Sequence, residues 1–148
     1  MKLEFIQVFY APEPFIGIAP GRLDVMGGIA DYSGSLLLQM PIAEETRVSL
    51  MPSTDGVFTA STDAIVQHQQ FSISLDQLKG LTLHEIGDQI KQLPGGDWAV
   101  YVLGCFKVLE QAIGLQWEGA TVFVESSVPA GKGVSSSAAI EVATMHAI

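Results

Sequence analysis

Residues 128–139 read Val-Pro-Ala-Gly-Lys-Gly-Val-Ser-Ser-Ser-Ala-Ala, and the rest of the chain is organised around them. A β-prone run, 120–124, leads into this stretch, and the run 138–143 that leads out of it has helical character. Glycines let a backbone approach a ligand closely. The first N–H groups of a helix lack intrahelical partners and lie at the positive end of its dipole. The order of strand, glycine loop and helix therefore predicts a phosphate site, with a plain helix capped by serine as the alternative.

This loop is not a Walker A loop, which requires glycine, four residues and then Gly-Lys-Ser or Gly-Lys-Thr. Lys132 is followed instead by Gly133. The string 129–138 resembles the second signature of the GHMP kinases, the family of galactokinase, homoserine kinase and mevalonate kinase, although Val134 stands where that family usually has leucine. The resemblance implies that the phosphates of ATP are held by Gly131, Lys132, Gly133, Val134, Ser135, Ser136, Ser137 and Ala138. It also implies that Ser137 lies near Mg²⁺.

Composition narrows the class of protein. The chain has 148 residues, which suits one domain, and 48% of them are hydrophobic. Only 16% are charged, which disfavours disorder. The net charge of −9 disfavours nucleic acid and anionic membranes as partners, because both attract clustered lysine and arginine. Small anions stay possible where a glycine loop and a single cation outweigh the overall charge.

The lone cysteine and the amino terminus point to a cytoplasmic protein. Cys105 excludes an internal disulfide and a cysteine-based zinc site, and its apolar helical setting predicts an inert buried thiol. Residues 1–5 lack the basic and apolar regions of a signal peptide. No apolar run reaches the roughly 20 residues of a membrane span.

The remaining patterns predict an α+β fold with many strands before its main helices. We expect a structured loop in the second half of the stretch 19–34, and a hairpin of 46–51 with 56–61 around the turn Ser-Thr-Asp-Gly. The other expected strands are 5–10, 15–19, 36–39 and 69–75. A short helix is expected over 84–93.

A longer helix is predicted from Asp97, as its N-cap, through about Ile113. Apolar residues recur at steps of three and four, which marks one buried face made of Trp98, Val102, Cys105, Leu109 and Ile113. Gly114 is the expected C-cap. Trp117 and Phe123 are interpreted as core residues.

A second informative stretch, 20–34, carries Arg22 among apolar residues and Asp31 beside a tyrosine in a glycine-flanked loop. One interpretation is an Arg–Asp pair that holds a tight turn. The other is a polyol site, because carboxylates accept hydrogen bonds from sugar hydroxyls and arginine stabilises charge on a transferring phosphoryl group. The residues alone leave both interpretations open.

The same stretch resembles the galactokinase signature Pro-Gly-Arg-Val-Asn-Leu-Ile-Gly-Glu-His-Thr-Asp-Tyr-Asn-Gly. Two motifs in the family's order identify residues 1–148 as a GHMP kinase amino-terminal domain, with a mixed sheet packed by helices. The resemblance implies that Arg22 is the catalytic cation and Asp31 a ligand of the ring hydroxyls. It implies a sugar kinase that transfers phosphate from ATP, with Mg²⁺, to the anomeric hydroxyl.

The departures from that signature favour a pentose. Galactokinases have Glu-His-Thr where this chain has Gly28, Ile29 and Ala30, and that Glu-His pair meets the hydroxyl on carbon 6 of galactose. L-arabinopyranose keeps the ring hydroxyl pattern of galactose and lacks carbon 6. Asp24, where galactokinases have asparagine, and the string 27–34, which includes Tyr32, resemble L-arabinokinases more closely. The substrate-binding residues that this resemblance implies are Asp24, Gly28, Ile29, Ala30, Asp31 and Tyr32.

The catalytic aspartate, the metal-binding glutamate and the third glycine motif of the family all follow the second signature. The chain ends at Ile148, within the next helix, so we expect a fragment that is inactive alone and exposes apolar surface able to promote oligomers. Galactokinase is the first alternative. A non-catalytic module that binds sugar or nucleotide is the second.

Overall fold

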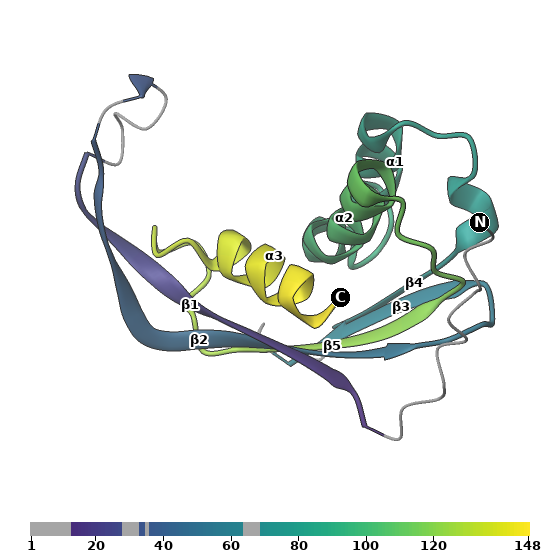
Figure 1. The fold of residues 1–148 in the computed structure, drawn as a ribbon, viewed down its shortest axis with the longest axis horizontal. Helices are drawn as coiled ribbons and strands as arrows, with labels where there is room; N and C mark the ends of the chain where they lie inside the picture. Colours follow the sequence, from purple (N-terminus) through teal and green to yellow (C-terminus); the bar gives the residue numbers. More distant parts are fainter. Residues whose placement is uncertain (1–12, 28–32, 35, 64–68) are drawn as a thin grey trace, which may run out of the picture.

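The computed structural model describes residues 13–27, 33–34, 36–63 and 69–148, and these form one mixed sheet with helices on one face (Figure 1). The strands are β1 (Phe15–Met26), β2 (Leu38–Pro52), β3 (Val57–Thr62), β4 (Gln69–Ser74) and β5 (Ala120–Ser126). The helices are η2 (Leu75–Leu78), α1 (Leu83–Lys91), α2 (Gly96–Ile113) and α3 (Ser136–Ala147). The α+β fold predicted from the sequence is confirmed. The strand expected over 5–10 lies outside the described residues.

The five-stranded sheet has the order β1-β2-β5-β3-β4. β5 is antiparallel to β2 and parallel to β3. The predicted hairpin of β2 with β3 is therefore wrong, because β5 lies between these two strands. The turn itself forms, but its backbone bonds go to the segment entering β5: Ser53 donates to the carbonyl of Gly119 and Gly56 to that of Glu118, both over 3.0 Å.

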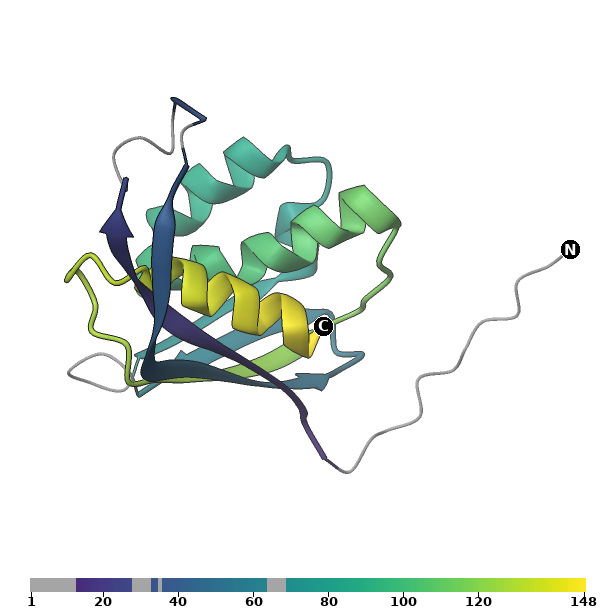
Figure 2. The same ribbon diagram turned by 60° about the vertical axis from the view of Figure 1, so that its left-hand side comes forward.

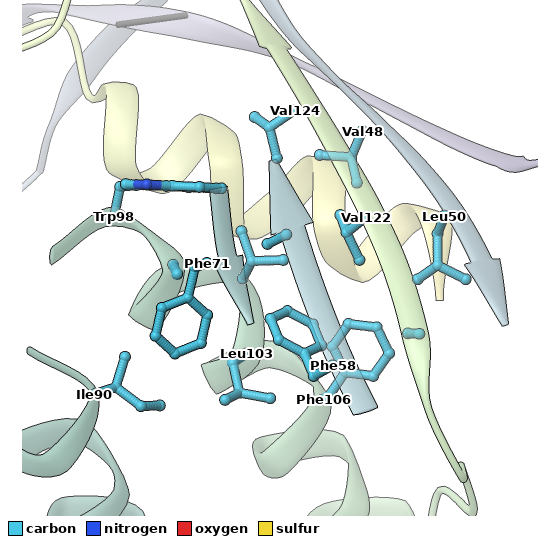
Figure 3. Close-up of a cluster of buried hydrophobic side chains, with 14 of the residues drawn as sticks. Val48, Leu50, Phe58, Phe71, Ile90, Trp98, Leu103, Phe106, Val122 and Val124 are labelled. Carbon is cyan, nitrogen blue, oxygen red and sulfur yellow. The ribbon is translucent and has the colours of Figure 1, made fainter. Parts of the chain in front are cut away.

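The core lies between the sheet and the helices (Figure 3). Alternate residues of the strands face it, as the period of two requires. Phe58 of β3 is fully buried, and its ring contacts those of Phe71, Phe106 and Trp117 with centroids 5.6–6.5 Å apart. The interpretation of Trp117 as a core residue is thus confirmed, although its side chain is only partly buried.

Helix α2 differs from the prediction at its start and in its last turn. Its N-cap is Gly95, at φ 74°, and no side chain caps it. Asp97 is therefore not the cap: the helix begins at Gly96, whose backbone packs so closely on the Ile90 carbonyl that a Cβ there would lie 1.7 Å from that oxygen. Ile113, the last residue of the helix, is 73% exposed, because the buried face of α2 ends at Phe106, which packs on Phe58. The C-cap at Gly114 is confirmed.

Helix α3 lies across β1 and β2, and its first turn lies beside the second half of β1, where Arg22 is (Figures 1 and 2). The crossing is close at Gly17, where a Cβ would lie 1.9 Å from the Ala143 carbonyl oxygen and 2.7 Å from the Ala147 nitrogen. Only glycine leaves room for this contact, so the position of α3 is tied to β1 at this point. Among the described residues, no helix is both long and apolar enough to cross a membrane.

Cys105 is buried between α2 and α3, as the sequence predicts, with its Sγ 3.1 Å from the Tyr101 carbonyl oxygen and 3.5 Å from that of Glu141. Burial, followed by the nearby Glu141 carboxylate, raises the pKa of this thiol from 9.0 to about 12. A thiol that stays protonated reacts slowly, because the thiolate is the nucleophile.

We expect the free energy of unfolding to fall between pH 9 and pH 12 because of this thiol. The unfolded thiol loses its proton near pH 9 while the folded one keeps it, so the stabilisation is complete below pH 9 and is lost as the pH rises through the folded pKa. The loss approaches about 1.4 kcal/mol per pH unit in this window. Urea unfolding at pH 8, 9 and 10 measures it. The Cys105→Ala variant should lack this contribution, and equal slopes for both proteins would contradict the assignment.

Candidate active site

The loop 127–135 joins β5 to α3, and three of its residues have a positive φ, which residues other than glycine rarely adopt. Gly131 and Gly133 have φ values of 69° and 73°, and a Cβ at either position would meet nothing within 4 Å. These glycines are therefore required by backbone conformation and not by space. Ser135 has φ 58°, and among the described residues it alone has a positive φ without being glycine. Such a conformation in a non-glycine residue is held in place by its surroundings.

The start of α3 is not an ordinary serine cap. Ser135 is the N-cap residue, but its side chain makes no capping bond to the helix. Its carbonyl accepts a hydrogen bond from the Ala139 N–H at a distance of 3.0 Å. The N–H groups of Ser136, Ser137 and Ala138 come before this bond and have no acceptor within the helix. Amides in this position, at the positive end of the helix, attract anions. The capped-helix alternative is therefore wrong for this helix.

Arg22 of β1 connects the two sequence motifs. Its backbone N–H donates to the Val134 carbonyl, with an N···O distance of 3.0 Å. Its Nε donates to the Ser135 hydroxyl, with an N···O distance of 3.1 Å. The hydroxyl that could have capped α3 accepts this bond from the guanidinium group. A cation thus lies directly beside the first turn of α3.

An irregularity in the pairing of β1 with β2 turns Arg22 toward the loop. Pro20 pairs with Glu45 and Arg22 with Pro41, so the single residue Gly21 lies opposite residues 42–44. Such an irregularity re-aims the side chains that follow it. The strand therefore continues through Pro-Gly-Arg to Met26, beyond the strand expected over 15–19.

Gly21 explains the glycine of the Pro-Gly-Arg motif. It is buried, and a Cβ there would lie 2.8 Å from Val128 Cγ1, 2.9 Å from Ile42 Cδ1 and 3.1 Å from the Val134 carbonyl oxygen. The loop packs onto the backbone of β1 at this residue. Its absent side chain lets Arg22, the next residue, reach the loop.

Residues that the sequence reasoning missed fix the beginning of the loop. The Ser127 hydroxyl accepts from the Glu45 N–H over 3.0 Å and donates to the Glu45 carbonyl over 3.2 Å. Ser126 shares a 2.7 Å hydroxyl bond with the buried Thr46 and accepts from the Val128 N–H. Two adjacent serines at the end of β5 were the only sequence signal for this anchor.

The structure describes most of the predicted site residues. Lys132 is exposed, and Ser137 is half-buried in the first turn of α3. Asp24 lies on β1 two residues beyond Arg22, where it accepts a hydrogen bond from Gln39 of β2. Gly28, Ile29, Ala30, Asp31 and Tyr32 lie outside the described residues.

Two family models match the chain. The model of the GHMP kinase amino-terminal domain matches residues 100–148, and the galactokinase galactose-binding signature matches residues 3–52. L-arabinokinase of Arabidopsis thaliana is 38% identical over 92% of this chain and 16% of its own length. Galactokinase of Chloroflexus aurantiacus is 33% identical over 94% of this chain and 32% of its own length. The chain thus spans a third or less of these relatives.

Solved structures share the fold. Galactokinase of Lactococcus lactis, complexed with galactose, matches 88% of this chain and 30% of its own, with a TM-score of 0.67 and 21% identity. Mevalonate kinase of Methanococcus jannaschii matches 90% of this chain and 39% of its own, with a TM-score of 0.65 and 16% identity.

The matched segments include both motifs that meet at Arg22, and the fold agrees with them. The chain is an amino-terminal domain of the GHMP kinase family. Within this family it belongs to the branch of galactokinase and L-arabinokinase.

Proposed function

We propose that the protein to which this domain belongs is a sugar 1-kinase, which transfers the γ-phosphoryl group of ATP to the anomeric hydroxyl of L-arabinose or a related pentose. The observation that carries the proposal is the pair of bonds from Arg22 to Val134 and Ser135. These bonds join the motif that resembles a sugar site to the loop that resembles a phosphate site. A phosphoryl transfer between the two ligands needs this proximity.

The chemistry of the loop suits the nucleotide. We assign the phosphates of ATP to residues 131–138, where the amides at the start of α3 and the Lys132 ammonium would offset their charge. Arg22 would stabilise the charge that spreads over the transferring phosphoryl group, as positioned arginines do in phosphoryl transfer. Its hydrogen bond to Ser135 fixes the guanidinium group before substrate binds.

The donors present fit Mg²⁺ only when ATP accompanies it. Among the described residues, no group of three histidine, cysteine, aspartate or glutamate side chains could hold a metal ion. Mg²⁺ commonly keeps several waters and is held largely by substrate phosphates. We therefore assign to Ser137 a single hydroxyl contact to an ion that arrives with the nucleotide, where the ion neutralises phosphate charge.

Replacing Ser137 by alanine should raise the KM for Mg·ATP about fivefold to tenfold and leave the KM for sugar unchanged, because one hydroxyl contact is lost. Initial rates at varied Mg²⁺ and fixed ATP measure the effect. Ser61→Ala, on β3, is the control for losing a half-buried serine hydroxyl outside the loop and α3. Nucleotide kinetics equal to the wild type would remove Ser137 from the site.

Two observations favour different sugars. The relative with 38% identity is named L-arabinokinase, and Gly28, Ile29 and Ala30 lack the polar groups suited to a hydroxymethyl arm. The model that matches residues 3–52 is a galactose-binding signature, which favours galactose. A hydroxymethyl group without polar partners would lose roughly 1–3 kcal/mol of binding.

The full-length gene product should therefore have a kcat/KM for L-arabinose at least about tenfold above that for galactose. A coupled assay for ADP with both sugars tests this. Equal values, or a preference for galactose, would contradict the pentose assignment and leave the sugar kinase. Binding of ATP and sugar without turnover would instead favour a non-catalytic module.

A further inference from the structure

A polar pair lies on an otherwise apolar part of the β1–β2 ribbon. Asp24 and Gln39 are paired across β1 and β2, and Gln39 Nε2 donates a hydrogen bond to Asp24 Oδ1 at a distance of 2.5 Å. The neighbouring side chains Leu23, Val25, Leu38 and Met40 are apolar and 43–55% exposed. Aspartate is disfavoured in strands, where β-branched and aromatic residues are preferred. A hydrogen bond between exposed side chains adds little to folding stability, so stability is a poor reason for this pair.

The pairing places Asp24 on the same side of β1 as Arg22. Between two irregularities, at Pro20/Arg22 and at Asp24/Met26, the register with β2 is regular. Residues two apart on a strand project from the same face and are separated by roughly 7 Å. Because the guanidinium group of Arg22 reaches Ser135, this face is the one toward the phosphate loop. Asp24 and Gln39 therefore lie beside Arg22, one step farther along the ribbon.

The pair leaves two hydrogen-bond acceptors and one donor for a ligand. Gln39 uses one N–H on Oδ1, and within the described part of the chain this leaves Oδ2 of Asp24, Oε1 of Gln39 and the second amide N–H without a partner. Neighbouring hydroxyls of a sugar ring need such a mixture of acceptors and donors. The backbones of Arg22 and Asp24 are separated by only roughly 7 Å, so a sugar whose reacting hydroxyl lies at Arg22 would have another ring hydroxyl near the pair.

We propose that Asp24 and Gln39 form a second hydroxyl-binding edge of the sugar site. Asp24 accepts hydrogen bonds from the sugar, and Gln39 is the positioning residue that holds the carboxylate in one orientation. The inference rests on the proposed sugar kinase activity, and it adds Gln39 to the residues that determine sugar specificity.

The test is a double-mutant cycle in the full-length gene product, with the sugar that the wild type phosphorylates. The Gln39→Leu variant is expected to raise the KM for that sugar about tenfold, and to leave kcat and the KM for ATP within about twofold. Asp24→Asn should also raise the KM for the sugar. In the double variant, the KM for the sugar should rise by less than the product of the two single increases, because both substitutions disrupt the same binding edge.

Deoxy analogues of the sugar supply a second readout. The wild type should have a higher KM for one monodeoxy analogue than for the sugar itself. The Gln39→Leu variant should have similar KM values for both, because its Asp24 carboxylate is no longer held in place to meet the hydroxyl that the analogue lacks. Gln70→Leu is the matched control: Gln70 is an exposed strand glutamine on β4, and its replacement should leave every constant unchanged.

The outcomes separate the inference from the function on which it rests. A wild type that phosphorylates no sugar would overturn the proposed function. An active wild type with a Gln39→Leu variant of unchanged sugar KM would overturn the inference alone. A variant in which the Tm and kcat fall and the KM values for sugar and ATP both rise would also overturn it, because the pair would then have a structural role.

Discussion

Replacing Arg22 by alanine is expected to lower kcat about 10³-fold while the Tm falls by only a few degrees. The guanidinium group is proposed to stabilise the transferring phosphoryl charge, and positioned arginines contribute about 10³-fold or more in such reactions. Its own side chain is exposed, and one hydrogen bond to Ser135 contributes about 1 kcal/mol to folding. Steady-state kinetics and thermal unfolding of the same preparation measure the two effects.

Arg47 offers a matched control. It is an exposed arginine on β2 between the buried residues Thr46 and Val48, so its side chain projects from the sheet face opposite to α3. Arg47→Ala should have nearly wild-type kcat. If Arg22→Ala lost stability and activity in equal measure, the interpretation of Arg22 as a structural cation, tied to the loop, would replace the catalytic one.

The second large effect is expected for Gly17→Ala, which should lower the free energy of unfolding by about 3 kcal/mol and the Tm by roughly 10 °C. A Cβ at this residue would lie 1.9 Å from the Ala143 carbonyl oxygen, which belongs to backbone and cannot rotate away. Helix α3 would have to move off β1. Since Arg22 meets the start of α3, kcat should fall as well. Chemical denaturation gives the first quantity and the kinase assay the second.

Gly104→Ala is the control, and its expected effect on the free energy of unfolding has the opposite sign. Gly104 lies within α2, and a Cβ there would meet nothing within 4 Å. Alanine is favoured over glycine in a helix by about 1 kcal/mol, so this variant should be slightly more stable. Unchanged stability for Gly17→Ala would show that α3 tolerates displacement from β1.

The sequence predicted elements whose signals are local. The helix closed by Gly114, the strand before the loop and the helix after it all follow from periodicity and punctuation. The β2–β3 hairpin was wrong because two strands joined by a good turn need not pair. Whether β5 enters between them depends on contacts far apart in the sequence, such as the bonds from Ser53 and Gly56 to residues 118–119. No local pattern encodes that insertion.

The candidate site was predictable as two motifs but not as one arrangement. Resemblance identified Arg22 and the serine loop, and it left open whether a serine caps α3. The answer lies in the irregular register around Gly21, which turns Arg22 toward Ser135. Gln39 could not be found in advance, because a single glutamine in an apolar run has no signature until its partner across the ribbon is known.

The place of β5 in the sheet has a consequence for biosynthesis. The β1–β2 and β3–β4 pairs can each assemble as soon as their residues leave the ribosome, but among the strands that the structure describes β5 alone joins them. Until residue 126 has emerged, the nascent chain consists of two ribbons whose facing edges are open, a state that invites pairing with other chains. The sheet can therefore be completed only after β5 has emerged, and the candidate phosphate loop forms at the same stage, because it begins where that joining strand ends.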